Sequence, residues 1–283
     1  MSRIVETLYD AYGQEFEFDE VYFERKTDHQ HLIIFHNPIF GRMMVLDGVV
    51  QTTELDEFIY HEMLAHVAIL AHGRVDNILV VGGGDGGIIR EITHHRGIRH
   101  ITQVEIDRTV IEMSRLHLPS HSAGAFDDPR LEIVIGEGLD FLRGDGEPYD
   151  VIICDSTDPI GPGETLFSQE FYTAIQGRLK PGGVFVAQNG VPFHQIDELC
   201  ATHHHLRSLF TDTSFYAAAV PSYVGGIMAF AWASDDQRLR NLSEEKLLAR
   251  YRDSGLSCRY YNPALHRASF ALPEYVLQAI QDV

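Results

Sequence analysis

The chain has 283 residues, of which 45% are hydrophobic and 22% are charged. This composition supplies enough apolar side chains for a sizeable core and excludes a disordered or collagen-like chain. The 41 acidic residues outnumber the 22 basic ones and give a formal net charge of −19. Such a surface repels phosphate backbones, so nucleic acid is not expected as a partner. Solubility alone accounts for much excess acid, and only the positions of the acids can show whether some of them bind cations.

The apolar runs, the N-terminus and the cysteines together predict a cytoplasmic protein without membrane contact. The longest apolar runs, such as 227–233, are too short to span a bilayer. The first ten residues contain acids and lack the apolar stretch of a signal peptide. The three cysteines, Cys154, Cys200 and Cys258, are scattered without a CxxC pair, which favours a reducing compartment over a disulfide framework.

The first 56 residues predict a small β-strand domain. Residues 16–19 alternate in polarity, and the apolar runs 31–35 and 43–46 are bounded by turn-forming residues. A helical period begins at Glu54 and runs to residue 72, with Thr52 or Thr53 available to cap its start. We therefore divide the chain into an N-terminal β domain, 1–56, and a second domain, 57–283.

From residue 77 onward, predicted strands alternate with predicted helices. Strands are expected at 77–81, 100–105, 131–135, 151–154 and 183–188, and helices between them at 88–95, 109–117, 139–142 and 168–179. Nearly continuous Val and Ile runs separated by helices predict a parallel sheet that is covered on both faces. Two further strands, 214–220 and 227–233, predict an antiparallel hairpin at the edge of the sheet. The fold class is therefore α/β, with a doubly wound, mostly parallel sheet.

The first four of these strands each end beside a carboxylate. The four strand ends are followed by Gly82 to Gly87 with Asp85 among them, by Glu105 and Asp107, by Gly136-Glu137-Gly138, and by Asp155 to Asp158. In open α/β sheets, ligands bind in the crevice beyond the carboxyl ends of the strands. The sequence therefore predicts an acidic ligand site at this edge of the sheet.

The glycine loop after the first strand formally matches a dinucleotide-binding pattern through Gly82, Gly84 and Gly87. Asp85 argues against a dinucleotide, because its carboxylate would repel a pyrophosphate held by the loop amides. Glu105, at the end of the next strand, is suited to accept hydrogen bonds from both ribose hydroxyls. The loops thus indicate a nucleoside without phosphates, such as S-adenosylmethionine or a relative.

The pair Asp155 and Asp158 is the predicted chemical centre. Two neighbouring carboxylates that are partly desolvated can raise one pKa into the range of a general base, and they can also bind a diammonium ligand. Pro159 and Gly161-Pro162-Gly163 predict an extended, turn-rich loop here, so a purely structural role in turns and caps is the alternative.

Other motifs are weaker. The segment His61 to His66 resembles a zinc-protease helix, but its second histidine stands at i+5 instead of i+4, so no metal site is expected. The runs His94-His95 and His203-His204-His205 are expected on solvated helix faces. No G-x-S-x-G elbow occurs. Cys154 is expected in a buried strand and Trp232 in packing.

Taken in order, several segments resemble the polyamine aminopropyltransferase family, and bacterial spermidine synthases in particular. The segments are LDGVVQTTELDEFIYHEM, GGGDGG, VEID, DSTDPIGP, AQNG, PSYVGGIMAFAWAS and CRYYNP, which extend over essentially the whole chain. The resemblance implies a Rossmann-like, methyltransferase-type fold. It also implies transfer of the aminopropyl group of decarboxylated S-adenosylmethionine to putrescine, giving spermidine and methylthioadenosine. It further implies a homodimer or homotetramer, and no metal or prosthetic group.

The resemblance also implies roles for individual positions. Asp155 would accept the proton of the attacking amine. The polyamine would lie near Tyr60, His61, Asp85, Asp158, Tyr223 and Gln51, with Asp85 on the aminopropyl ammonium. The nucleoside cosubstrate would lie near Gln30, Gly82, Gly84, Glu105, Glu137, Gly138 and Pro162, with Glu105 on the ribose. Glu137 departs from the family pattern, which usually has Asp there, so its side-chain contact is open while the backbone contact at Gly138 is retained.

Two alternatives to an aminopropyltransferase stay open at this point. The first is an S-adenosylmethionine methyltransferase of the same fold, which Asp85 opposes because it would face the carboxylate of that cosubstrate. The second is a polyamine-binding protein without catalysis. The preferred amine among putrescine, cadaverine, agmatine and spermidine is also left open by the sequence.

Overall fold

The N-terminal region is built from β-strands, as predicted. The computed structural model describes residues 2–6, 8–9, 11–157 and 161–281, and the structural statements below concern these residues. Strands β1 and β2 pair in antiparallel fashion, and β3 to β6 form an antiparallel four-stranded sheet in sequence order. The strands are β1 Ser2–Val5, β2 Glu15–Phe18, β3 Glu20–Lys26, β4 His31–Asn37, β5 Gly41–Leu46 and β6 Val49–Thr53.

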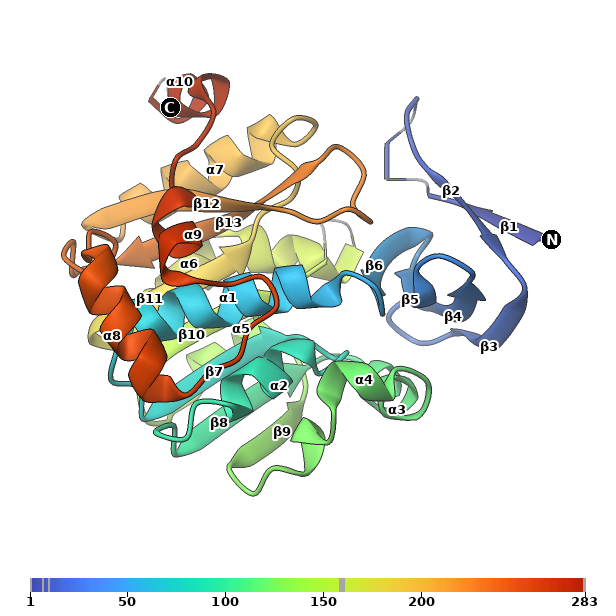
Figure 1. Cartoon of the computed structure of the whole chain (residues 1–283), viewed down its shortest axis with the longest axis horizontal. Coiled ribbons are helices and arrows are strands. Elements are labelled where there is room, and N and C mark those ends of the chain that lie inside the picture. The colour runs from blue at the N-terminus through green and yellow to red at the C-terminus, as the bar shows by residue number, and fades with distance from the viewer. Residues whose placement is uncertain (1, 7, 10, 158–160, 282–283) are drawn as a thin grey trace.

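A seven-stranded sheet in the order β12-β13-β11-β10-β7-β8-β9 forms the centre of the rest of the chain (Figure 1). The strands from β11 to β9 run parallel, and β12 and β13 form an antiparallel hairpin at one edge. The strands are β7 Asn77–Gly82, β8 His100–Glu105, β9 Leu131–Ile135, β10 Tyr149–Asp155, β11 Leu179–Gln188, β12 Asp212–Ala219 and β13 Ile227–Ser234. The predicted α/β fold class, the parallel strands and the edge hairpin are confirmed.

Helices cover both faces of this sheet. Successive residues of a strand point to opposite faces and therefore belong to two different buried clusters. Ile78 and Val80 of β7 pack with α1, α2, α8 and α9, whereas Leu79 and Val81 pack with α5, α6, α7 and α10. The helices are α1 Glu57–His72, α2 Gly87–Thr93, α3 Arg108–His117, α4 Pro119–Ser122, α5 Gly138–Arg143, α6 Gln169–Arg178, α7 Ile196–Arg207, α8 Glu244–Ser254, α9 Pro263–Ala268 and α10 Glu274–Gln281, with 3₁₀ turns η1 Ala125–Asp127 and η2 Gly161–Phe167. Among the described residues, none of the helices combines the length and the apolar content that a membrane span requires.

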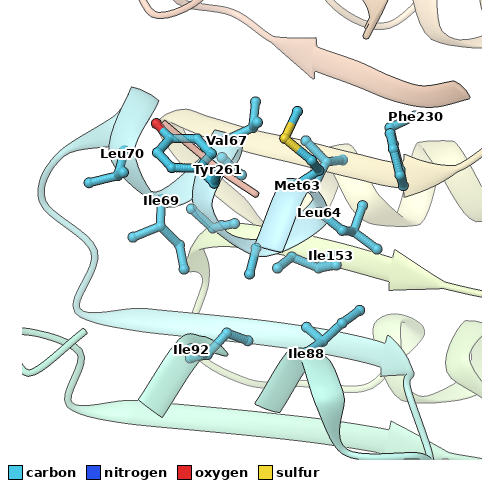
Figure 2. Close-up of a cluster of buried hydrophobic side chains, with 14 of the residues drawn as sticks. Met63, Leu64, Val67, Ile69, Leu70, Ile88, Ile92, Ile153, Phe230 and Tyr261 are labelled. Carbon is cyan, nitrogen blue, oxygen red and sulfur yellow. The ribbon is translucent and has the colours of Figure 1, made fainter. Parts of the chain in front are cut away.

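Helix α1 is buried almost all round. Figure 2 shows Met63, Leu64 and Val67 of this helix between Phe230 of β13 and the Tyr261 ring, with Ile88 and other side chains of the cluster close by. The carboxylate of Glu62, itself 3% exposed, accepts N–H bonds from residues 259, 260 and 261 at 2.8, 2.8 and 2.7 Å. The helix is therefore held by the sheet on one side and by the C-terminal segment on another.

The predicted start of this helix is wrong by three residues. The helix begins at Glu57, and residues 54–56 form a turn in which the Glu54 carboxylate accepts the Arg42 N–H at 2.9 Å. Neither threonine caps the helix as expected. Thr52 hydrogen-bonds to His121 at 2.9 Å, and Thr53 donates to the Asp56 carboxylate at 2.6 Å. In place of the expected cap, Thr52 thus pairs with a distant residue and Thr53 with the turn that precedes the helix.

The prediction of a solvated face for His94 and His95 is half wrong. His94 has an exposed side chain, but His95 is 7% exposed and lies 3.0 Å from His66 Nδ1. Both residues follow the end of α2, where the chain turns His95 inward. In α7, His204 is exposed, and its neighbours His203 and His205 are half-buried.

Two other single-residue predictions are confirmed. Cys154 is buried within β10, where burial raises the pKa of its thiol to about 12. Trp232 is fully buried and donates its Nε1–H to Asp212 at 3.0 Å.

The chain reverses its direction of travel through the sheet between β7 and β10. After β7 it adds β8 and β9 on one side, and then returns to place β10 on the other side of β7. Asp155, the last residue of β10, is the register partner of Gly82, the last residue of β7. A crevice is expected at this switch point.

We predict that Glu62→Ala destabilises the fold by about 3 kcal/mol, because it leaves one buried and two partly buried backbone N–H groups of the C-terminal segment without an acceptor. The melting temperature should fall, and amide exchange should rise first at residues 259–261. Glu132→Ala, at an exposed position in β9, is the control and should change neither measurement. Equal melting temperatures for the two variants would contradict the anchoring role of Glu62.

Candidate active site

A cleft of about 210 Å³ lies at the carboxyl ends of β7, β8, β9 and β10, with the N-terminal sheet on its far side. Its described lining includes Gln30, Met44, Leu46, Gln51, Tyr60, His61, Gly82, Gly83, Gly84, Asp85, Glu105, Ile106, Glu137, Gly138, Asp155, Ser156, Thr157 and Tyr223. Lys and Arg are absent from the described residues of this lining. The described lining of the cleft therefore combines several carboxylates with no lysine or arginine side chain.

The glycine loop takes a path that only glycine tolerates at two points. Gly82 has φ +84°, and a Cβ on it would lie 2.0 Å from the carbonyl oxygen of Asp155. A Cβ on Gly84 would lie 2.9 Å from the Glu105 carboxylate. The side chain of Gln103 donates to the carbonyls of Gly82 and Gly83 at 3.0 and 2.7 Å. The loop can therefore bring its backbone against both acids, because it has no side chains in the way.

Asp155 is held at the cleft wall by Tyr60. The Tyr60 hydroxyl donates to Asp155 Oδ1 at 2.5 Å. Burial, together with the nearby Asp85 charge, raises the pKa of Asp155 to about 6, although the hydrogen bond from Tyr60 acts in the opposite direction. A carboxylate with such a pKa can accept a proton near neutral pH.

Asp85 is buried and paired with His61. His61 Nε2 lies 3.2 Å from one carboxylate oxygen of Asp85, and the other oxygen accepts the Gly87 N–H at 2.8 Å. Burial opposes the charge of Asp85, but His61 outweighs it and holds the pKa of Asp85 below its usual range. The other ring nitrogen of His61, Nδ1, lies 2.6 Å from Glu57, so both nitrogens are bonded to carboxylates. His61 therefore faces the cleft as the partner of Asp85.

Glu105 lies deeper, beside the glycine loop. Its carboxylate accepts the Asp107 N–H at 2.9 Å, and burial raises the pKa of Glu105 to about 7 despite that bond. Gln30 reaches this place from the N-terminal region, and its side-chain amide donates to Asp107 Oδ2 at 3.3 Å. The end of β8 and the N-terminal region thus meet beside Glu105.

The opposite wall of the cleft is formed by aromatic and amide side chains. Tyr223 donates its hydroxyl to the carbonyl of Gln51 at 2.6 Å, and its ring lies edge-on to Tyr60 with 6.0 Å between centroids. The Gln51 side chain donates to the Val49 carbonyl at 3.2 Å. Residues that are far apart in the sequence are therefore brought together around Tyr60.

The remaining predicted positions follow β9 and β10. Glu137 and Gly138 line the cleft at the start of α5, where a Cβ on Gly138 would lie 2.5 Å from Val81. Pro162 belongs to η2. Asp158 lies outside the described residues.

One group of side chains also has metal-ligand spacing. Among the described residues, His61, Asp85 and Asp155 offer ligand atoms that lie within 4.8 Å of one another. Since His61 Nδ1 is bonded to Glu57, a metal would have to take Nε2 and displace its bond to Asp85. An ammonium group can approach the two carboxylates from the cleft and leave that bond in place.

Two side chains that build this site, Glu57 and Gln103, were not predicted from the sequence, and a third, Asp107, was predicted only as an acid at a strand end. Glu57 bonds His61, Gln103 holds the glycine loop, and Asp107 bonds Gln30. The i,i+4 spacing of Glu57 and His61 on a predicted helix was a usable indication, because residues at this spacing share one face. Nothing local indicates Gln103, which reaches Gly82 from the neighbouring strand β8.

The fold and the cleft define a class of protein: an α/β protein with a ligand cleft at its switch point and several carboxylates in the described lining. Comparison with known families agrees. The family model for the spermine/spermidine synthase domain matches residues 57–243, and that for the spermidine synthase tetramerisation domain matches residues 4–54. The chain belongs to the spermidine synthase family and is a polyamine aminopropyltransferase of bacterial type.

Individual relatives are similar over nearly their whole length. Polyamine aminopropyltransferases of Klebsiella pneumoniae and Salmonella arizonae are 57% and 55% identical, each over 97% of this chain and 96% of the relative. A crystal structure of a spermidine synthase in complex with the transition state analogue AdoDATO matches 100% of this chain and 96% of its own, with a TM-score of 0.93 and 37% identity. The Thermotoga maritima spermidine synthase matches 100% of this chain and 95% of its own, with a TM-score of 0.92 and 36% identity.

We predict that Tyr60→Phe raises the pKa of Asp155 further, by about one unit, because a hydrogen bond to the ionised form is lost. Carboxyl ¹³C chemical shifts of labelled aspartates, followed against pH, measure this directly. Tyr172→Phe is the matched control, since Tyr172 is buried and bonds Thr202 away from the cleft. An unshifted Asp155 titration in Tyr60→Phe would contradict the contact.

Proposed function

We propose that this chain transfers the aminopropyl group of decarboxylated S-adenosylmethionine to putrescine, giving spermidine and methylthioadenosine. The observation that carries the proposal is the pair of acids at the switch point. Asp155, with its raised pKa, lies beside the ionised Asp85 in a cleft whose described lining has no Lys or Arg. Such a pocket favours a ligand with several ammonium groups, and it can take a proton from one of them.

The nucleoside part of the cosubstrate would occupy the side of the cleft near Glu105. In this proposal Glu105 accepts the ribose hydroxyls, and the backbone at Gly82, Gly84 and Gly138 approaches the cosubstrate closely. Gln30, Glu137 and Pro162 complete this side. The proposal is supported by the missing side chains of the loop, since a Cβ at Gly82 or Gly138 would collide with neighbouring atoms.

The polyamine would occupy the side of the cleft near Tyr60. Asp155 and Asp158 bind the attacking amine, and Asp85, oriented by His61, binds the ammonium of the aminopropyl group. Tyr223 and Gln51 line the pocket that the carbon chain of the amine follows. Support comes from the described acids of this group, which face the same cleft as the two tyrosines.

The chemistry requires a neutral amine in line with the carbon next to sulfur. The amine nitrogen forms a bond to that carbon while the carbon–sulfur bond breaks. The electron pair of the broken bond stays on sulfur, which becomes the neutral thioether of methylthioadenosine. The amine proton passes to Asp155. Because the sulfonium is already a good leaving group, positioning and proton acceptance are the work left to the protein, and we propose that it uses no metal and no prosthetic group.

Three further statements belong to the same proposal. The chain divides functionally near residue 56, and it assembles as a homodimer or homotetramer, which the match of residues 4–54 to a tetramerisation domain supports. It acts in a reducing compartment such as the cytoplasm, which the low number and scattered placement of its three cysteines support.

The decisive experiment incubates the protein with decarboxylated S-adenosylmethionine and putrescine and measures methylthioadenosine and spermidine. Both products should appear in equal amounts. Cadaverine, agmatine and spermidine tested in place of putrescine rank the acceptors by kcat/KM. Binding of the diamine without release of methylthioadenosine would refute catalysis, and methyl transfer from S-adenosylmethionine would replace the proposal by a methyltransferase.

Asp155→Asn is expected to lower turnover by about 10²–10⁴-fold, because the proton acceptor is lost, while methylthioadenosine still binds.

The same change, Asp155→Asn, should stabilise the fold at pH 8. A raised pKa means that the ionised Asp155 costs stability, a cost that appears as the pH rises through about 6. Removing it should contribute about 1–2 kcal/mol, seen as a melting temperature higher by a few degrees. Asp253→Asn, at an exposed position in α8, is the control for charge removal alone.

The pH dependence of kcat/KM for putrescine should show the Asp155 titration. Below a pH of about 6 Asp155 is protonated and cannot accept the amine proton, so kcat/KM falls. From pH 7 toward 9 it should rise further, because more of the amine is neutral. A profile that is flat from pH 5 to 9 would count against proton acceptance by Asp155.

A further inference from the structure

We propose that Glu57 and Arg90, which do not line the cleft, are positioning residues for aminopropyl transfer: they hold His61 as an imidazolium whose Nε2–H fixes the Asp85 carboxylate. This inference rests on the proposed function, in which Asp85 binds the ammonium of the cosubstrate. It assigns a task to a buried ion pair at the N-terminal end of α1 that the mechanism above leaves unexplained.

The Glu57 carboxylate connects His61 to Arg90. Glu57 is 7% exposed and stands one turn before His61 on α1. Its Oε2 lies 2.6 Å from His61 Nδ1 and 2.8 Å from Arg90 Nη2, and its Oε1 accepts from Arg90 Nη1 at 3.0 Å. The Glu57 anion at Nδ1 keeps a proton on that nitrogen. Nε2 then either carries a second proton, which it donates to Asp85, or carries none. The distance of 3.2 Å to Asp85 Oδ2 fits a donated proton.

Arg90 is fixed by bonds on every side of its guanidinium. Besides the fork to Glu57, Nε donates to Glu91 at 2.7 Å, and Nη1 donates to the carbonyls of Ser120 and His121 at 3.0 and 2.8 Å. A planar group with this set of partners can hold the Glu57 carboxylate in one orientation, which a lysine cannot do.

The His61 ring has no room to adopt another position. A Cβ on Gly87 would lie 2.2 Å from His61 Nδ1, so the ring packs directly on the backbone at the start of α2. The charged or titratable groups around it are Glu57 and Tyr60 of α1, Asp85 of the glycine loop, Arg90 of α2, His121 of α4 and Asp155 of β10. Burial alone would lower the pKa of His61, but Asp85 and Glu57 raise it to about 10.

Glu57 and Arg90 thus act on the reaction through two further side chains. Without the Glu57 anion, His61 is left buried with one carboxylate and Arg90 nearby, and its pKa falls toward the neutral range. Once His61 is neutral, its remaining proton stays on Nε2, which faces Asp85, so the bond persists but is no longer charge-assisted and holds the carboxylate less firmly. Asp85 also loses the nearby cation that supports its charge.

The primary test compares wild type with Glu57→Gln and Arg90→Lys. Residue-specific ¹⁵N spectra of histidine, assigned with His61→Gln, report the protonation of His61 against pH. Wild type should keep both His61 nitrogens protonated at pH 8, and Glu57→Gln should lose a proton within the neutral range. kcat/KM for decarboxylated S-adenosylmethionine should fall by about tenfold to a hundredfold in both variants, and more steeply as pH rises. The affinity for methylthioadenosine, which has no ammonium group, should stay unchanged.

A double-mutant cycle separates positioning from general destabilisation. If Glu57 acts through His61, then Glu57→Gln added to His61→Gln causes no further loss of kcat/KM, whereas it causes the full loss in wild type. Asp212→Asn breaks a comparable buried fork to Arg240 far from the cleft, and it should lower the melting temperature but leave the pH profile and the His61 signals unchanged.

Three results would overturn the inference: a neutral His61 in wild type at pH 8, an unchanged His61 titration in Glu57→Gln, or additive losses in the cycle. The first is measured on wild type, with His61→Gln used only to assign the signals, so poor folding of Glu57→Gln does not protect the proposal. Failure of the proposed function is recognised separately, as the absence of methylthioadenosine release by wild type.

Discussion

The structure depends on how three carboxylates are kept at one buried edge of the sheet. Burial opposes the charge on Asp85, Asp155 and Glu105 alike, yet each of the three has a different kind of partner. Asp85 has a cationic partner in His61 and stays ionised. Asp155 has a hydroxyl donor, and its pKa is raised to about 6; Glu105 has a backbone donor, and its pKa is raised to about 7. The same chemical group thus acquires three protonation behaviours from its surroundings, and the glycine loop allows all three to approach one cleft.

This arrangement leaves the cleft short of positive charge. The excess of acids in the composition does not explain that shortage, because most acids of the chain lie on the surface, where water solvates them. What matters is that the described lining contains no Lys or Arg to neutralise the acids. In the proposed reaction, a sulfonium nucleoside and a diamine bring the missing charges, so their binding relieves the repulsion between carboxylates. In the same proposal, Asp155, whose pKa is raised, favours proton loss from one amine.

Much of this could be predicted from sequence, because it depends on strand ends. Nearly continuous apolar runs located β7 to β11, and the rule for ligand sites in α/β sheets then selected Asp85, Glu105 and Asp155. Side chains that act across the fold were not predictable in this way. Glu62 binds the backbone of residues 259–261, nearly two hundred positions later, and His95 lies against His66 just after the end of α2. The start of α1 was misplaced for the same reason, since Glu54 bonds Arg42 of a neighbouring strand.

Helix α1 shows how the fold converts these distant contacts into a rigid site. Three successive residues, Tyr60, His61 and Glu62, point about 100° apart around the helix axis, and each reaches a different part of the molecule. Tyr60 bonds Asp155 of the cleft, His61 bonds Asp85 of the glycine loop, and Glu62 bonds the C-terminal segment. A rotation of the helix that improved one of these bonds would break the other two. The orientation of both cleft acids is therefore set by a helix that is itself fixed from three sides, and one of those sides is formed by a segment that never touches the cleft.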